Sequence, residues 1–135
     1  MRDGLTEKRR AHPGEGGGLA GFLERYEATL VVVRGSLAGE EYPLDCDKLS
    51  IGRGPGVDIT FDDVELSAQH AAVEFSGECF RVSDLGSTNG TFVNGKPIHA
   101  KDLNSGDRIE LGRHLLQFRL EARPREPRVY LVPDD

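Results

Sequence analysis

The sequence has few cysteines, no long apolar run and no excess of basic residues. Its 2 cysteines, Cys46 and Cys79, stand alone, with neither a CxxC pair nor a histidine at ligand spacing, so nothing indicates a metal site there. No segment approaches the roughly 20 consecutive apolar residues that span a bilayer, and we expect no membrane partner. A formal net charge of -6 disfavours sequence-independent nucleic-acid binding, which needs a surplus of Lys and Arg. Any anion-binding site must therefore be local.

Other patterns are missing as well. The N-terminus lacks the apolar core and cleavage pattern of a signal peptide, so a cytoplasmic location is expected. Between residues 28 and 121 there is no helix-length apolar run at helical spacing, which argues against most α/β enzyme folds. The histidines show no metal spacing, and we expect no metal and no cofactor; they are His12, His70, His99 and His114.

A chain of 135 residues suits one domain with a single core. Residues 1–27 are predicted to be a flexible tail because they are charged and then glycine-rich, although 19–27 could form a short helix that depends on docking. Residues 28–121 are predicted to form the domain. Residues 122–135 are predicted to leave it as a second tail, with one apolar patch at 129–132, and we expect a monomer.

Within 28–121, short runs of Val, Ile, Leu and Phe alternate with turn residues, a pattern typical of successive strands. The Asn94-Gly95 pair is a strong hairpin signal because both residues accept positive φ. The spacing predicts an all-β fold, a two-sheet sandwich of about eleven mostly antiparallel strands. The candidate strands are 28–34, 40–45, 48–53, 57–61, 71–76, 79–84, 91–93, 96–98, 107–111 and 114–120.

Three polar motifs fall in predicted loops, where binding residues concentrate on a rigid sandwich. They are Gly52-Arg53, the segment 67–70 (SAQH) and the segment 84–91 (DLGSTNGT). An arginine supplies a planar fork of donors for a carboxylate or phosphate, while Ser, Thr and Asn supply hydroxyl and amide groups. Gathered at one end of a sandwich, such a set would hold one dianionic group and the backbone of an extended peptide.

These motifs resemble the ordered signature of the forkhead-associated (FHA) family, which reads GR, SxxH and (S/T)xNG(T/S)xxNG. Residues 28–121 carry all three in that order, the last as STNGTFVNG. The resemblance implies an eleven-stranded sandwich that binds phosphothreonine peptides through its loops. The implied partners are a phosphothreonine-containing protein, either a Ser/Thr kinase or its substrate, and the implied role is a signalling adaptor or regulator without enzymatic activity.

The resemblance also assigns roles by position. Arg53 and Ser67 would contact the phosphate, Thr88 would support the loop on its side, and Asn89 would bind the peptide main chain. Gly52, His70, Gly86 and Gly90 would support the site structurally. Ala68 stands where the family often has Arg, Lys or Asn, so only its backbone N–H could serve and binding should be weaker. Glu65 would face the third residue after the phosphothreonine, and Thr6 is a candidate phosphosite in the tail.

Three other interpretations compete with this one. A sandwich of this family without phosphate dependence could act as a scaffold, and this alternative stays open. Ser67, His70 and Asp84 contain the residue types of a hydrolase triad, but there is no GxSxG elbow. The glycine-rich segment 52–56 lacks the Lys-Ser/Thr of a P-loop, and no predicted helix follows it. Catalysis and nucleotide binding are therefore disfavoured.

Overall fold

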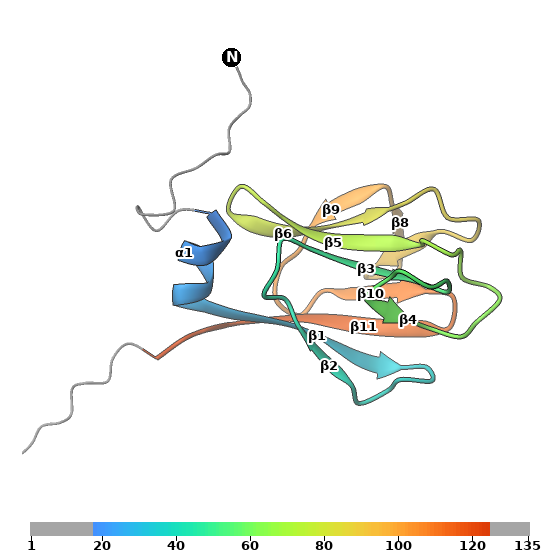
Figure 1. The fold of residues 1–135 in the computed structure, drawn as a ribbon, viewed down its shortest axis with the longest axis horizontal. Helices are drawn as coiled ribbons and strands as arrows, with labels where there is room; N and C mark the ends of the chain where they lie inside the picture. Colours follow the sequence, from blue (N-terminus) through green and yellow to red (C-terminus); the bar gives the residue numbers. More distant parts are fainter. Residues whose placement is uncertain (1–17, 125–135) are drawn as a thin grey trace, which may run out of the picture.

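The computed structural model describes residues 18–124, which form one helix and eleven strands (Figure 1). The elements are α1 (Gly18–Arg25), β1 (Tyr26–Arg34), β2 (Glu41–Pro43), β3 (Lys48–Gly52), β4 (Ile59–Thr60), β5 (Ala71–Ser76), β6 (Cys79–Asp84), β7 (Thr91–Val93), β8 (Lys96–Ile98), β9 (Ala100–Asp102), β10 (Arg108–Leu111) and β11 (His114–Ala122). The expected tail phosphosite Thr6 and the apolar patch 129–132 lie outside the described residues.

The strands form two sheets that pack face to face. One sheet has the order β2-β1-β11-β10-β7-β8 and the other β4-β3-β5-β6-β9. Among the pairings of the described residues, β3 with β4 is parallel and the others are antiparallel. The predicted all-β sandwich of mostly antiparallel strands is thus confirmed.

The core lies between the sheets because strands alternate inward apolar and outward polar residues. Leu30 and Val32 of β1 face the interior with 0% and 1% exposure, and Phe118 of β11 is also 1% exposed. From the other sheet, Val73 and Val82 are both fully buried. No helix within residues 18–124 is long and apolar enough to cross a membrane.

The described structure extends before the predicted domain start at residue 28, with α1 beginning at Gly18 and β1 at Tyr26. Phe22 of α1 is only 7% exposed, and its ring centroid lies 5.0 Å from that of Phe75 and 5.6 Å from that of Phe80. A helix this short is marginal alone. Docking of Phe22 on the sandwich therefore stabilises a segment that composition alone assigned to a flexible tail.

The candidate strands numbered ten, and the structure adds β9. Residues 100–102 have no apolar alternation; β9 forms as an edge partner of β6, where Arg81 pairs with Asp102 in register and through a 2.8 Å Nε–Oδ1 contact. The predicted hairpin at Asn94-Gly95 is confirmed, with φ of 52° and 84° at the two positions and Val93 opposite Lys96.

Candidate functional site

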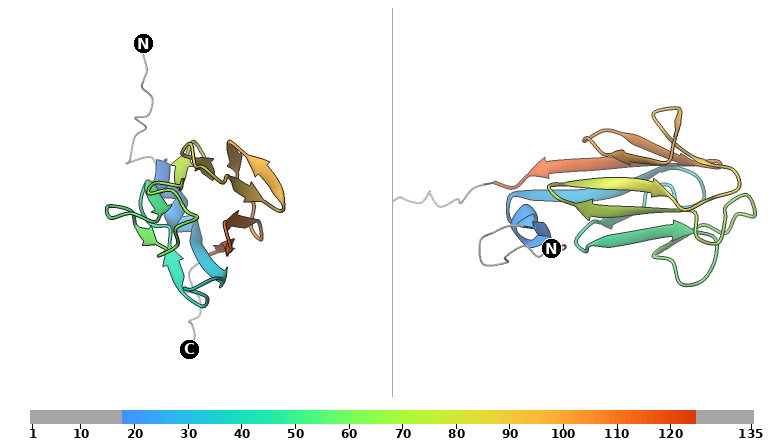
Figure 2. Two further views of the ribbon diagram at one scale, coloured as in Figure 1. Left: turned by 90° about the vertical axis from the view of Figure 1, so that its right-hand side faces the viewer. Right: turned by 90° about the horizontal axis from the view of Figure 1, so that it is seen from above.

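The three motif loops meet at the end of the sandwich opposite α1 (Figures 1 and 2). They are residues 53–58 after β3, 61–70 after β4 and 85–90 after β6. We call this the loop end. The strands β3 and β6 both run toward it, so the sheet brings together motifs that are separated in sequence.

The first loop is held against the second by main-chain hydrogen bonds. The N–H of Arg53 donates to the Ser67 carbonyl at 3.0 Å, and that of Gly54 donates to the Ala68 carbonyl at 3.2 Å. At Gly52, an added Cβ would lie 2.1 Å from the Ala68 carbonyl oxygen. Only glycine permits this close approach of the two backbones, so Gly52 is required for Arg53 to sit beside Ser67.

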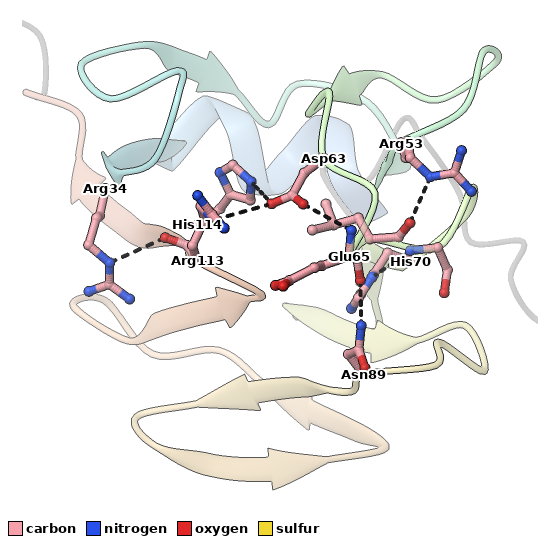
Figure 3. Close-up of polar contacts among 10 residues, drawn as sticks. Arg34, Arg53, Asp63, Glu65, His70, Asn89, Arg113 and His114 are labelled. Carbon is pink, nitrogen blue, oxygen red and sulfur yellow. Dashed lines mark hydrogen bonds and ion pairs between the residues drawn. The ribbon is translucent and has the colours of Figure 1, made fainter.

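The Arg53 side chain is exposed but oriented. Its Nε donates to the Leu66 carbonyl at 2.9 Å (Figure 3). Within the described residues, the two terminal guanidinium nitrogens have no hydrogen-bond partner. The side chain is therefore fixed at Nε, while its outer donors remain available to a phosphate or carboxylate.

Ser67 is at the centre of the site. Its N–H donates to His70 Nδ1 at 3.2 Å, and its Oγ accepts the Thr88 N–H at 3.0 Å. Since the hydroxyl acts here as an acceptor, its own proton stays free to donate to a ligand. The Ala68 N–H also has no partner among residues 18–124, so two adjacent donors remain available.

His70 links the second and third loops from the interior of the sandwich, through one hydrogen bond to each loop. It is fully buried; since Nδ1 accepts from the Ser67 N–H, Nε2 carries the proton and donates to the Gly90 carbonyl at 2.8 Å. Neither ring nitrogen is left to take a proton from the Ser67 hydroxyl. Ser67, His70 and Asp84 thus do not have the geometry of a hydrolase triad.

The third loop is organised by Asp84 at the end of β6. One carboxylate oxygen accepts the N–H groups of Gly86 and Ser87, both at 3.0 Å, and the other accepts the Ser87 and Thr91 hydroxyls. Burial raises the pKa of Asp84, but these hydrogen bonds outweigh it and hold the pKa below its ordinary value. The ionised carboxylate shapes a turn in which Gly86 and Gly90 have positive φ, 77° and 91°, a region that disfavours other residues.

Asn89 connects the third loop with the second. Its Nδ2 donates to the Glu65 carbonyl at 2.7 Å. The side-chain oxygen and the second amide hydrogen remain for a ligand, which suits the main chain of an extended peptide. Glu65 and Thr88 are both exposed beside it.

Three members of this network were given no structural role from the sequence. Asp84 and Ser87 lie within the quoted third motif, and an Asx-type pattern of Asp followed by Gly-Ser could have suggested their turn. Asp63 is the third: its Oδ1 accepts the Glu65 N–H at 2.9 Å, and its Oδ2 lies 2.9 Å from Nε2 of His114. His114 is 51 positions away, and no local pattern relates the two residues.

Comparison with known proteins supports the family assignment. The FHA domain model matches residues 49–112. An oxoglutarate dehydrogenase inhibitor of Corynebacterium jeikeium is 40% identical over 107 residues, which are 79% of this chain and 74% of that protein. The glycogen accumulation regulator GarA of Mycolicibacterium smegmatis is 44% identical over 91 residues, 67% of this chain, and the chain spans 58% of its length.

A solved structure agrees with both relatives. It comes from a structural and functional analysis of phosphothreonine-dependent FHA domain interactions, with a TM-score of 0.63 and 34% identity. The match covers 69% of this chain and 95% of that one. With the three motifs, the sandwich topology and these matches in agreement, the chain belongs to the FHA domain family.

Proposed function

We propose that this chain is a phosphothreonine-dependent protein-binding module that acts as a regulator in Ser/Thr-kinase signalling. The observation that carries the proposal is the position of Ser67. Its main chain and side chain are bound to Arg53, His70 and Thr88, each from or beside a motif loop, yet the outer donors around it have no partner within residues 18–124. Such a preorganised group of donors suits one compact dianion.

The phosphate would bind at Arg53 and Ser67. The terminal nitrogens of Arg53 would bind two phosphate oxygens, and the Ser67 hydroxyl with the Ala68 N–H would bind the third. Thr88 would close this side, since its N–H already bonds the Ser67 hydroxyl. The methyl of Ala68 adds no donor, so we expect weaker phosphate binding than a basic side chain would give.

The rest of the peptide would extend past Asn89 toward Glu65. Asn89 would accept a peptide N–H and donate to a peptide carbonyl while keeping its bond to the Glu65 carbonyl. The exposed Glu65 carboxylate would favour a basic residue at the third position after the phosphothreonine and disfavour an acidic one.

The energetics are sufficient for such a reader. A phosphothreonine carries a charge of about -1.5 to -2, and a hydrogen bond to a charged group contributes roughly 1.5–3 kcal/mol. Two or three of these bonds with main-chain contacts would reach micromolar affinity, about -8 kcal/mol, after association costs.

The proposed role is regulation by binding and not catalysis. The two relatives are named as an inhibitor and a regulator, and both ring nitrogens of His70, the imidazole beside Ser67, are occupied by backbone groups. We infer that the partner is a phosphorylated protein of a kinase pathway, a kinase or its substrate, met in the cytoplasm. The folded unit that carries the function would include α1, while capture of a phosphorylated Thr6 by the same site stays a prediction.

Isothermal titration calorimetry tests the proposal with a phosphothreonine peptide pool and its unphosphorylated twin at fixed salt. Wild type should bind only the phosphorylated pool. Arg53→Ala should lose about 100-fold in affinity, since it removes charge-assisted bonds worth about 3 kcal/mol. Arg108→Ala, at an exposed arginine of β10, is the matched control and should bind like wild type.

Two outcomes would contradict the proposal. Equal binding of both pools would favour the phosphate-independent scaffold, with partners sought regardless of phosphorylation. An affinity that falls equally in Arg53→Ala and Arg108→Ala would indicate general attraction between a cationic surface and an anionic peptide, not a built phosphate site.

A further inference from the structure

A largely buried carboxylate–imidazole pair lies at the start of the loop that carries Ser67, and neither of its side chains is a proposed ligand contact. Asp63 follows β4 in one sheet, and His114 begins β11 in the other. His114 Nε2 and Asp63 Oδ2 are 2.9 Å apart, with side-chain exposures of 3% and 10%. The pair therefore joins the two sheets at the loop end (Figure 3).

Packing fixes the His114 ring. It stacks on Phe61 with centroids 4.1 Å apart and planes at 27°. At the ring edge, a Cβ at Gly35 would lie 2.2 Å from His114 Nδ1, so the Gly35 backbone closes against that nitrogen. His114 is thus packed into the core and its ring is fixed in orientation.

The hydrogen bonding also has a single direction. Nδ1 of His114 is buried and has no partner among residues 18–124. A second ring proton there would be an unsatisfied buried donor, so the ring carries its proton on Nε2 and donates it to Asp63. The N–H of Glu65 and then the His114 bond hold the pKa of Asp63 below its ordinary value against burial, so its carboxylate is ionised and accepts.

Asp63 connects His114 to the binding loop through two hydrogen bonds to its backbone. Its Oδ1 accepts the Glu65 N–H at 2.9 Å and its carbonyl accepts the Leu66 N–H at 3.0 Å. The carbonyls of these same two residues are the acceptors that orient Asn89, at 2.7 Å, and Arg53 Nε, at 2.9 Å. In Figure 3 the bonds run from His114 through Asp63 and Glu65 to Asn89.

We propose that Asp63 and His114 are positioning residues that fix the Glu65 and Leu66 carbonyls, and through them Asn89 and Arg53, in the peptide-binding arrangement. The effect that this inference predicts on peptide affinity rests on the proposed function. The inference itself goes beyond that function because neither residue would touch the peptide. Without the tie to β11, the loop keeps its local turn but loses its fixed distance from the opposite sheet.

Arg113 is the alternative anchor of the same carboxylate. Its Nε lies 3.8 Å from Asp63 Oδ2 and its side chain is 72% exposed, which makes it a weak, solvent-screened contact. Arg34 donates from Nε to the Arg113 carbonyl at 3.2 Å and does not bond Asp63. Arg113→Ala is therefore the matched control.

Three substitutions separate the hydrogen bond from the packing. His114→Phe keeps an aromatic ring against Phe61 but removes the donor, whereas His114→Gln removes the ring but keeps an amide donor of similar reach. Asp63→Asn keeps the acceptor for the Glu65 N–H, since Asn forms the same turn, but presents an amide to His114. Affinity for the phosphothreonine pool should fall about tenfold in His114→Phe and Asp63→Asn, and His114→Gln and Arg113→Ala should stay within about twofold of wild type.

The second measurement uses the free protein. In ¹H–¹⁵N spectra, the side-chain signals of Asn89 Nδ2 and Arg53 Nε should shift in His114→Phe and Asp63→Asn and stay in place in Arg113→Ala. If both signals are unmoved in the folded variants, or if affinity is unchanged in His114→Phe, the inference is wrong. A wild type that binds no phosphopeptide would overturn the proposed function instead, and the spectra would still decide the positioning role.

Discussion

The two ends of this sandwich are closed in different ways. At the α1 end, Phe22, Phe75 and Phe80 form an aromatic cluster with ring centroids 5.0 to 5.6 Å apart. At the loop end, closure comes from hydrogen bonds of buried or half-buried polar groups, including His70 and Asp84. The α1 end thus depends on apolar burial, whereas the loop end adds directed polar contacts to its own buried apolar side chains.

The difference matters for function because apolar packing is non-directional, whereas each hydrogen bond fixes an angle and a distance. An aromatic cluster stabilises the fold without specifying where a donor points. The loop end fixes the positions of Arg53, Ser67 and Asn89 to within hydrogen-bond tolerances. Stability and ligand geometry should therefore respond separately to changes at the two ends.

The largest effect is expected from Phe80→Ala at the α1 end. Phe80 is 1% exposed, and truncating a buried phenylalanine costs about 3–5 kcal/mol of the free energy of unfolding. Urea denaturation should show this loss, while calorimetry on the folded protein should give phosphopeptide affinity within about twofold of wild type. Phe80→Leu gives a milder form if the alanine variant does not fold. A loss of affinity in folded Phe80→Leu would mean that the two ends are coupled.

Asp84→Asn at the loop end should have a smaller effect on stability than Phe80→Ala. Unlike Phe80→Ala, it should also weaken phosphopeptide binding. The amide cannot replace both carboxylate oxygens, and donors from Gly86, Ser87 and Thr91 would lose partners. We expect a loss of about 2 kcal/mol in unfolding free energy and weaker phosphopeptide binding, because Thr88 and Asn89 lie on the same turn. Denaturation and calorimetry on one preparation measure both.

The same substitution has a defined pH signature. Because the folded pKa of Asp84 is held below its ordinary value, its contribution is fully present above the unfolded pKa, about 3.9, and is lost as pH falls through the folded pKa. The difference in stability between wild type and Asp84→Asn should thus be large at pH 7 and shrink toward pH 3. A difference that stays constant over that range would show that the carboxylate charge is not what organises the turn.

Sequence reasoning was most accurate where the determinants are local. Alternating apolar residues predicted the sandwich, and Asn94-Gly95 predicted its hairpin, since both depend on neighbours within a few positions. The position of α1 depends instead on Phe22 packing on Phe75 and Phe80, which are more than 50 positions later in the sequence. The strand β9 depends on the free edge of β6 and not on its own pattern.

The candidate site divides in the same way. The motif residues are recognisable because each motif is a short local pattern, and the three occur in a fixed order along the chain. The Asp63–His114 pair was not predictable, because it joins positions 51 apart that come together only when the two sheets pack. Its signal is geometric: a buried ring with one nitrogen that has no partner in the described part of the chain, and a carboxylate that bonds the backbone of the next loop residues.

The smallest effect is expected from adding a donor at the loop end with Ala68→Arg. The Ala68 side chain is exposed, although its Cβ lies 3.1 Å from where a Cβ on Gly54 would be, so a longer side chain must extend outward, toward the proposed phosphate. One further exposed charge-assisted bond should improve phosphopeptide affinity about tenfold, which is about 1.4 kcal/mol, and leave urea stability unchanged. Ala68→Gln, of similar length without charge, is the control and should gain little. Equal gains in both variants would mean that side-chain length and not charge is limiting, and a gain for the unphosphorylated pool would place the new arginine outside the phosphate site.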